Sequence, residues 1–255
     1  NDRVDSIVNE LLTVGSNIDP VFIPLADWGI EIDDNYPYMF ETLLTESIGV
    51  EKLLKELAEN APHSLNFNEV TQLIEMTALK EPPININYIN NQENIVGTVN
   101  PVDMPEMRIS QVFVRFGQRD PTKKLDELNN YSQTYIRDNL ASSGPDEYGS
   151  EKIETINSRW INNFNKAAAV ELAAKKGRRF EMTPRKISYK VTAKDSDLWI
   201  GDNIGIIHPE LQLPTGEQGN NIYQIMSVQE AGDFNYTALE YTYGAALPDD
   251  PDSGI

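Results

Sequence analysis

The chain has 255 residues, of which 40% are hydrophobic and 24% charged, a composition typical of a folded protein with one large or two medium domains. With no cysteine and two histidines, it excludes a disulfide framework and a thiol nucleophile and argues against a metal site. The net charge of −19 is uneven: residues 1–107 carry 19 acidic and 4 basic side chains, residues 108–194 carry 10 and 17, and residues 195–255 carry 11 and none. Acidic flanks argue against a general nucleic-acid clamp.

The N-terminal third predicts a small α+β unit over residues 1–81. Apolar residues at helical spacing predict one helix over residues 2–14 and another from about Ser47 to Ala61, where Pro62 ends it. Alternation around Leu65 and Phe67 and a second stretch over residues 73–79 predict a hairpin. Pro82-Pro83 then marks a boundary, because proline cannot continue a helix or donate to a strand ladder.

Beyond that boundary the apolar pattern changes to a period of two, which predicts an antiparallel β body. Its strands are expected near residues 84–88, 108–116, 185–192, 202–208, 222–230 and 234–243. The two halves of this body, 84–118 and 185–243, are separated by residues 119–184, which contain a predicted helix at 162–176. Residues 244–255 are polar and proline-rich, and they predict a flexible tail or linker. No apolar run approaches the roughly 20 residues of a membrane span.

No nucleotide-binding loop, zinc-protease or serine-hydrolase motif is present, so no catalytic, cofactor-binding or metal-ligating residue is predicted. Carboxylate pairs such as Asp33-Asp34, Asp195 with Asp197, and Asp249-Asp250 could serve a hydrolase that needs two carboxylates. A chain with 40 acidic residues contains such pairs by chance.

Two other groups of residues are candidates for assembly and for the core. The densest basic run contains Lys175, Lys176, Arg178 and Arg179, at the end of the predicted helix 162–176, and it is a candidate for ion pairs within the chain or between subunits. Trp28, Trp160 and Trp199 lie near element ends and are predicted core anchors, with Trp160 against that helix and Trp199 inside the β body.

Five segments occur in this order along the chain: IDPVFIPLADW (18–28), GVEKLLKELA (49–58), RISQVFVRFGQRDP (108–121), INSRWI (156–161) and AKDSDLWIGD (193–202). In this order they resemble the central region of tail hub (tail-tip, baseplate hub-like) proteins of tailed bacteriophages. The resemblance covers about residues 4–243. It implies that 84–118 and 185–243 form one tube-type antiparallel β-barrel, that 119–184 is a helical or α+β insertion, and that the chain is part of a longer hub.

The resemblance also implies a function: a non-enzymatic virion protein, without cofactor, at the distal end of the tail. It would form a homotrimer that closes the tail tube and lines the DNA exit path. Its partners would be other tail proteins (distal tail, tape-measure, tail-tip or fibre proteins), the host surface receptor indirectly, and DNA only in transit. An acidic bore, suited by residues 195–255, would repel DNA phosphates. Two alternatives remain, a carboxylate-dependent cell-wall or polysaccharide hydrolase and a β-rich glycan- or receptor-binding module.

Overall fold

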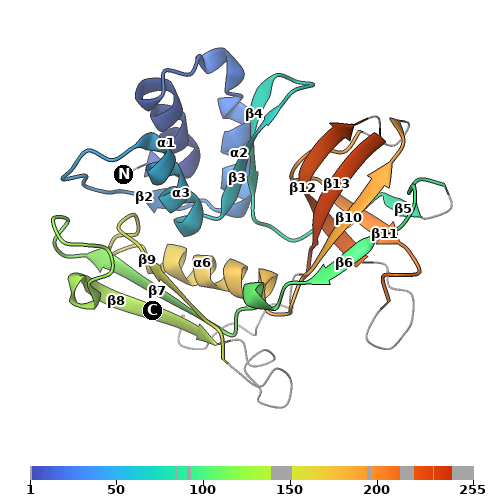
Figure 1. Ribbon diagram of the computed structural model, residues 1–255. Coiled ribbons are helices and arrows are strands. Elements are labelled where there is room, and N and C mark those ends of the chain that lie inside the picture. Colours follow the sequence, from blue (N-terminus) through green and yellow to red (C-terminus); the bar gives the residue numbers. More distant parts are fainter. Residues whose placement is uncertain are drawn as a thin grey trace. The chain divides into compact units, whose positions relative to one another are not determined.

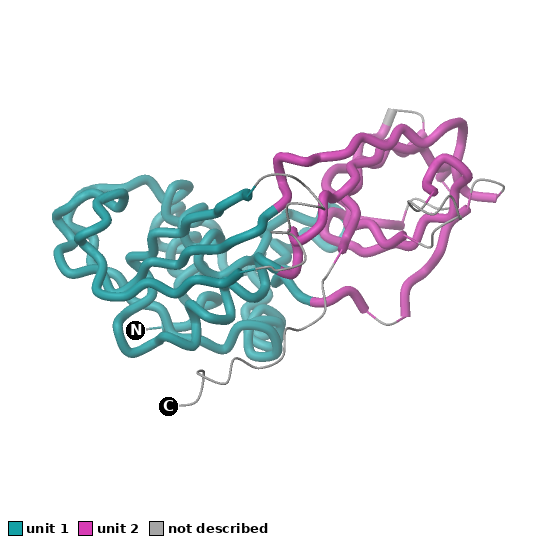
Figure 2. The backbone as a smooth tube through the Cα atoms, turned by 90° about the horizontal axis from the view of Figure 1, so that it is seen from below, with its two compact units in different colours: residues 1–80, 109–177 teal, residues 81–108, 178–255 magenta. Residues whose placement is uncertain are grey.

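The computed structural model describes residues 2–83, 85–90, 93–138, 151–193, 197–212, 221–231 and 233–242. The fold is a sheet-rich α+β fold with few helices, and it consists of two compact units (Figure 1; Figure 2). Unit 1 contains residues 1–80 and 109–177, and unit 2 contains residues 81–108 and 178–255. Each unit is therefore assembled from two separate stretches of sequence, and the chain changes unit three times.

The first stretch of unit 1 is mainly helical. Helix α1 (Val4–Glu10) continues into a π-helical turn, η1 (Leu11–Gly15), and is followed by a 3-10 turn, η2 (Pro20–Phe22), by α2 (Leu25–Asn35) and by α3 (Val50–Asn60). Short strands β1 (Asp2–Arg3) and β2 (Met39–Phe40) pair, as do β3 (His63–Asn68) and β4 (Leu73–Ala78). The predicted first and second helices and the hairpin are confirmed. Helix α2 was not predicted, although Trp28 and Ile32 form its buried face and the buried Tyr36 follows it directly.

The second stretch of unit 1 adds a three-stranded sheet and a long helix. Strand β7 (Gln111–Gln118) is central, with β8 (Tyr131–Asp138) antiparallel on one side, after the 3-10 turn η4 (Leu128–Asn130), and β9 (Ile153–Asn157) parallel on the other. Helix α6 (Lys166–Arg179) lies beside this sheet (Figure 1), and its Ala168, Ala169 and Ala173 are fully buried. The buried hydroxyl of Tyr36 donates to the carbonyl oxygen of Ala168 at 2.7 Å, which ties the helical stretch to α6.

Unit 2 is a six-stranded sheet that curls around one core. Its strands are β5 (Tyr88–Asn90), β6 (Asn100–Asp103), β10 (Arg185–Val191), β11 (Asn203–Ile207), β12 (Asn221–Ala231) and β13 (Asp233–Glu240), in the order β5-β11-β12-β13-β10-β6, with the 3-10 turn η3 (Pro105–Met107) after β6. Alternate residues of β10, such as Ile187, Tyr189 and Val191, point into the core. Ile89 of β5 and Val99 beside β6 join the same cluster, which requires the sheet to bend strongly.

Two features differ from the predicted barrel. First, no ladder joins β5 to β6 within the described strands, so hydrogen bonds do not close this sheet. Pro101 in β6 has no N–H to donate, which suits an edge strand, and all four β6 residues are exposed. Second, β7 pairs with β8 and β9 in unit 1 rather than with the strands of unit 2. The first part of the β body was predicted to end at residue 118, but the first stretch of unit 2 ends at residue 108. The second part was predicted to begin at residue 185, but the second stretch of unit 2 begins at residue 178. The tail predicted at 244–255 lies outside the described residues.

Candidate functional site

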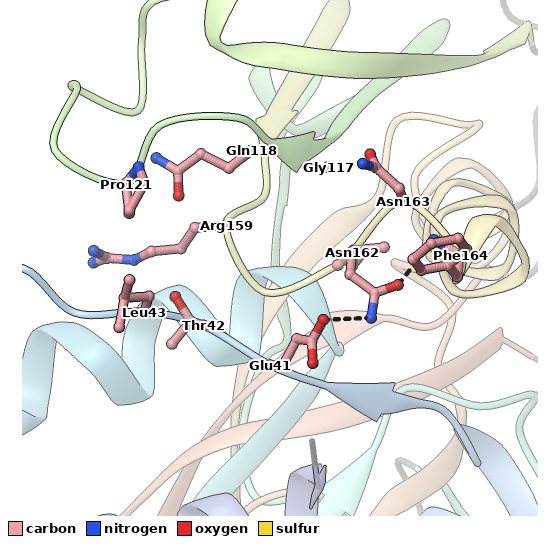
Figure 3. A pocket seen from close by; sticks show the side chains of 11 residues that line it. Glu41, Thr42, Leu43, Gly117, Gln118, Pro121, Arg159, Asn162, Asn163 and Phe164 are labelled. Carbon is pink, nitrogen blue, oxygen red and sulfur yellow. Dashed lines mark hydrogen bonds between the residues drawn. The ribbon is translucent and has the colours of Figure 1, made fainter.

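The surface of unit 1 contains a hollow of about 470 Å³ where three stretches of chain meet (Figure 3). One wall follows β2, one is the end of β7, and one is the segment between β9 and α6. We call this the Phe164 hollow, and its lining residues are Glu41, Thr42, Leu43, Gly117, Gln118, Pro121, Arg159, Ile161, Asn162, Asn163 and Phe164. Leu43 is 66% exposed and Phe164 is 97% exposed, so two large apolar side chains face solvent at this site.

The backbone around Phe164 is held by a set of hydrogen bonds. The hydroxyl of Ser158 accepts from the backbone N–H groups of Trp160 and Ile161 at 3.2 and 3.0 Å. The amide of Asn162 donates to the carboxylate of Glu41 at 2.7 Å, as drawn in Figure 3, and its carbonyl oxygen accepts from the backbone of Phe164 at 2.9 Å. Because hydrogen bonds fix the backbone that carries this exposed phenylalanine, little backbone entropy remains to be lost on binding.

An ion pair forms one side of the hollow. The guanidinium of Arg159 donates from Nε and Nη2 to Oε2 of Glu56 on α3, at 2.9 and 2.5 Å. Both side chains are largely buried. The pair joins the segment that carries Phe164 to α3, and because its charges compensate each other it adds little net charge to the site.

A second hollow of about 530 Å³ adjoins the first and shares Gln118, Pro121 and Arg159 with it. Three exposed lysines line it, Lys52 at the start of α3 and Lys123 and Lys124 after β7, together with the carboxylates of Glu46 and Asp126. We call it the lysine hollow. Within the described residues, the side-chain nitrogens of these three lysines make no hydrogen bond or ion pair. The two hollows together combine exposed apolar side chains with a rim on which three lysines outnumber the carboxylates of Glu46 and Asp126.

Asp120 fixes the turn that precedes Lys123 and Lys124. Its carboxylate accepts from the hydroxyl and backbone N–H of Thr122 at 2.6 and 3.0 Å. These hydrogen bonds, assisted by the charge of Lys123, lower the pKa of Asp120. The loop conformation is thus set by its own side chains.

Unit 2 has a hollow of a different chemistry on the outer face of its sheet. It measures about 670 Å³ and is lined by polar side chains that point outward from neighbouring strands, including Ser188 and Lys190 of β10 and Asn235 and Thr237 of β13. The rings of Tyr189 and Tyr236 stack at 5.5 Å, but both are buried in the core rather than offered to a ligand. Among its described residues, this face offers hydrogen-bonding groups and no exposed aromatic ring for stacking.

The four predicted interface cations all make contacts within their own unit. In unit 1, buried Lys175 donates to the carbonyl oxygen of Leu79 at 2.9 Å, and Lys176 pairs with Glu154 of β9 at 2.8 Å. In unit 2, Arg178 pairs with Glu81 at 3.3 Å.

Arg179 is also buried and donates to the carbonyl oxygen of Glu240 at 2.8 Å. Its guanidinium lies 4.3 Å from the ring centroid of Tyr241, and burial lowers its pKa. Lys176 and Arg178 keep partly exposed side chains, so a role for the basic run between subunits stays a prediction that rests on these two residues.

The predicted core anchors lie in different environments. Trp28 and Trp160 are buried in unit 1, and the indole N–H of Trp28 donates to the carbonyl oxygen of Ile74 at 2.9 Å. Trp199 of unit 2 is only partly buried. Of the carboxylate pairs, Asp33 forms an ion pair with Arg3, and Asp195, Asp249 and Asp250 lie outside the described residues.

In the described part of the chain, no three or more His, Cys, Asp or Glu side chains are grouped closely enough to hold a metal ion. Nor does any described helix have both the length and the apolar character needed to cross a membrane. The Phe164 and lysine hollows were not predicted. Phe164 is an isolated apolar residue in the sequence Asn162-Asn163-Phe164-Asn165, which is the one local signal that could have identified it.

The fold is shared with a phage tail protein of known structure. The crystal structure of a 43 kDa tail protein of prophage MuSo2 from Shewanella oneidensis matches 95% of this chain and 66% of that one, with 11% identity and a TM-score of 0.51. The virion of a gene transfer agent particle gives 14% identity over 79% of this chain and 41% of its own, with a TM-score of 0.49. A tail protein from Neisseria meningitidis gives 14% identity over 78% of this chain and 56% of its own, with a TM-score of 0.46.

This chain therefore spans 41 to 66% of the length of these three chains. No protein-family model matches the sequence, and no curated protein matches it. At 11% identity, the likeness to the prophage protein establishes a shared fold and nothing about residue roles.

Proposed function

We propose that this protein is a structural subunit of a bacteriophage-type tail, carried in the virion. The observation that carries the proposal is the fold shared with the prophage tail protein over 95% of this chain. The site chemistry supports it. The Phe164 hollow exposes large apolar side chains on a fixed backbone, which suits a protein partner, because exposed apolar patches with polar rims are typical of protein-protein contacts.

We further propose that the subunit belongs to the hub at the distal end of the tail and forms a homotrimer there. The collinear sequence resemblance to hub proteins supports this refinement. This homotrimer would close the distal end of the tail tube and connect it to the distal tail, tape-measure, tail-tip or fibre proteins. It would also line the path by which DNA leaves. The open edges of the unit 2 sheet support assembly, since unpaired strand groups at β6 can bond to a neighbouring chain.

Localisation in purified particles tests the structural role. Antibodies against this chain are expected to label one end of the tail in electron micrographs of the particles. Mass spectrometry of the same particles should find the chain at a fixed ratio to the tube protein. Particles that assemble fully and contain none of the chain would overturn the proposal, and label along the tube length would overturn only the hub assignment.

A hydrolase remains the competing function and is tested separately. Glycoside hydrolysis needs two carboxyl groups at a set separation. The Phe164 hollow is lined by one carboxylate, Glu41, which Asn162 already binds. The purified chain is expected to release no reducing sugar from cell-wall polysaccharide. Turnover that is lost in an E41Q variant but kept in a D34N variant would favour the hydrolase.

A further inference from the structure

Unit 1 carries a second exposed surface whose charge is opposite to that of the lysine hollow. It is the outer face of α2, where Ile30 is 63% exposed. Asp27 precedes Ile30 by three residues and Asp34 follows it by four, so helical spacing places both carboxylates beside the isoleucine. Neither carboxylate makes a hydrogen bond or ion pair within the described residues, and no basic residue occurs between Arg3 and Lys52.

The two surfaces are complementary both in their exposed apolar area and in their charge. On one, Leu43 and Phe164 supply exposed apolar area beside the exposed lysines Lys123 and Lys124. On the other, Ile30 supplies the apolar area between two acidic side chains. An apolar centre with a charged rim is the usual anatomy of a specific interface, and opposite rims fix the orientation in which two proteins meet.

Different elements of the same unit form these surfaces, which determines the kind of assembly they can support. The acidic face belongs to α2, whereas the lysine side is built by the start of α3 and by the loops after β2 and β7 (Figure 1). Two complementary patches on different faces of a unit produce a head-to-tail contact, which closes into a ring or continues as a row. A two-fold dimer would require both patches to lie within one self-complementary surface.

We propose that the α2 face of one copy of this chain binds the Phe164 and lysine hollows of the next copy. Ile30 contacts Phe164 and Leu43, while Asp27 and Asp34 lie opposite Lys123 and Lys124. The occupant is a second copy because this chain itself supplies the matching charge and apolar side chain. The inference rests on the self-association in the proposed function and names the residues that carry it.

A charge-exchange experiment on the full chain tests the contact. Two double variants, D27K/D34K and K123E/K124E, are each expected to weaken self-association about tenfold in analytical ultracentrifugation. Combining all four substitutions restores opposite charges across the contact, so the association constant should return to within about threefold of the original. The control K152E/K186E, at two exposed lysines that line none of the hollows described above, is expected to leave association unchanged.

Salt and the apolar centre provide the second readout. The loss caused by charge reversal should shrink in high salt, because the Debye length falls to about 3 Å at 1 M. The loss caused by F164S should persist there. Circular dichroism checks that each variant is folded.

The contact is overturned if the original chain is monomeric at every concentration and salt, or if the fourfold variant associates no better than the double variants. It is also overturned if F164S abolishes binding to another tail protein and leaves self-association intact. Labelling of the tail in micrographs is read independently, so the tail assignment can stand when this contact fails.

Discussion

Removing the hydroxyl of Tyr36 should destabilise unit 1 by about 1–2 kcal/mol. Tyr36 follows α2, is buried, and lies 2.7 Å from the carbonyl oxygen of Ala168 in α6 and 3.2 Å from that of Asn60 at the end of α3. A hydroxyl has one proton, so Y36F removes one good hydrogen bond. After the substitution, the carbonyl oxygen of Ala168 can still accept a hydrogen bond within α6. The carbonyl oxygen of Asn60 has no such partner, because Asn60 lies in the last turn of α3, where carbonyls lack helical donors.

The assay is urea or thermal unfolding followed by tryptophan fluorescence. Trp28 and Trp160 lie in unit 1, so a W199F background makes the signal report that unit alone. For a unit of roughly 150 residues, each kcal/mol lost from the free energy of unfolding lowers the melting temperature by about 2–4 °C. The melting temperature of Y36F is therefore expected to fall by about 2–8 °C. The matched control is Y38F, since the Tyr38 hydroxyl makes no hydrogen bond within the described residues. A Y36F variant as stable as Y38F would refute the reasoning.

Three further predictions concern unit stability. Replacing Arg159 by Leu should cost about 3–5 kcal/mol because it leaves the Glu56 carboxylate uncompensated, and the double variant R159L/E56L should cost less, which a double-mutant cycle in urea measures. Burial raises the pKa of Tyr131 and of Tyr223 to about 12, so as the pH rises the unfolded chain releases these protons at a lower pH than the folded chain does. The free energy of unfolding should therefore be constant up to about pH 9 and fall above about pH 10. A urea midpoint unchanged at about pH 11 would contradict this. G117A should lower the melting temperature, because Gly117 has φ +68° and an added Cβ would overlap the side chain of Asn163; an unchanged melting temperature would show that the loop rearranges freely.

The elements with strong local patterns were predictable from the sequence. The stripe through Leu53 and Leu57 and the stop at Pro62 indicate α3, and the period of two indicates β10 to β13. Helix α2 was missed because Pro20 and Pro24 suggest an irregular segment, and because exposed Leu25 and Ile30 blur the apolar stripe through Trp28 and Ile32. Local pattern is a weak guide where tertiary packing selects the structure.

The partner of a strand is harder to predict than the strand. The alternation of Val112, Val114 and Phe116 indicates β7 correctly, but its neighbours β8 and β9 lie in a region that the sequence presented as mainly helical. The Phe164 hollow could not be predicted from the sequence for the same reason. Ser158 and Asn162 hold the backbone that carries Phe164, and one of these hydrogen bonds, from Asn162 to Glu41, joins residues that only the fold brings together.

The three passages of the chain between the two units constrain how the protein can be synthesised and divided. Unit 1 lacks its central sheet and α6 until residue 177 has left the ribosome, while β5 and β6 must wait, unpaired, for β10 and β11. Neither unit corresponds to one continuous piece of the gene. A truncation at any single point between residues 81 and 177 would therefore leave both units incomplete, so separate expression of either one requires a designed linker across the excised stretch.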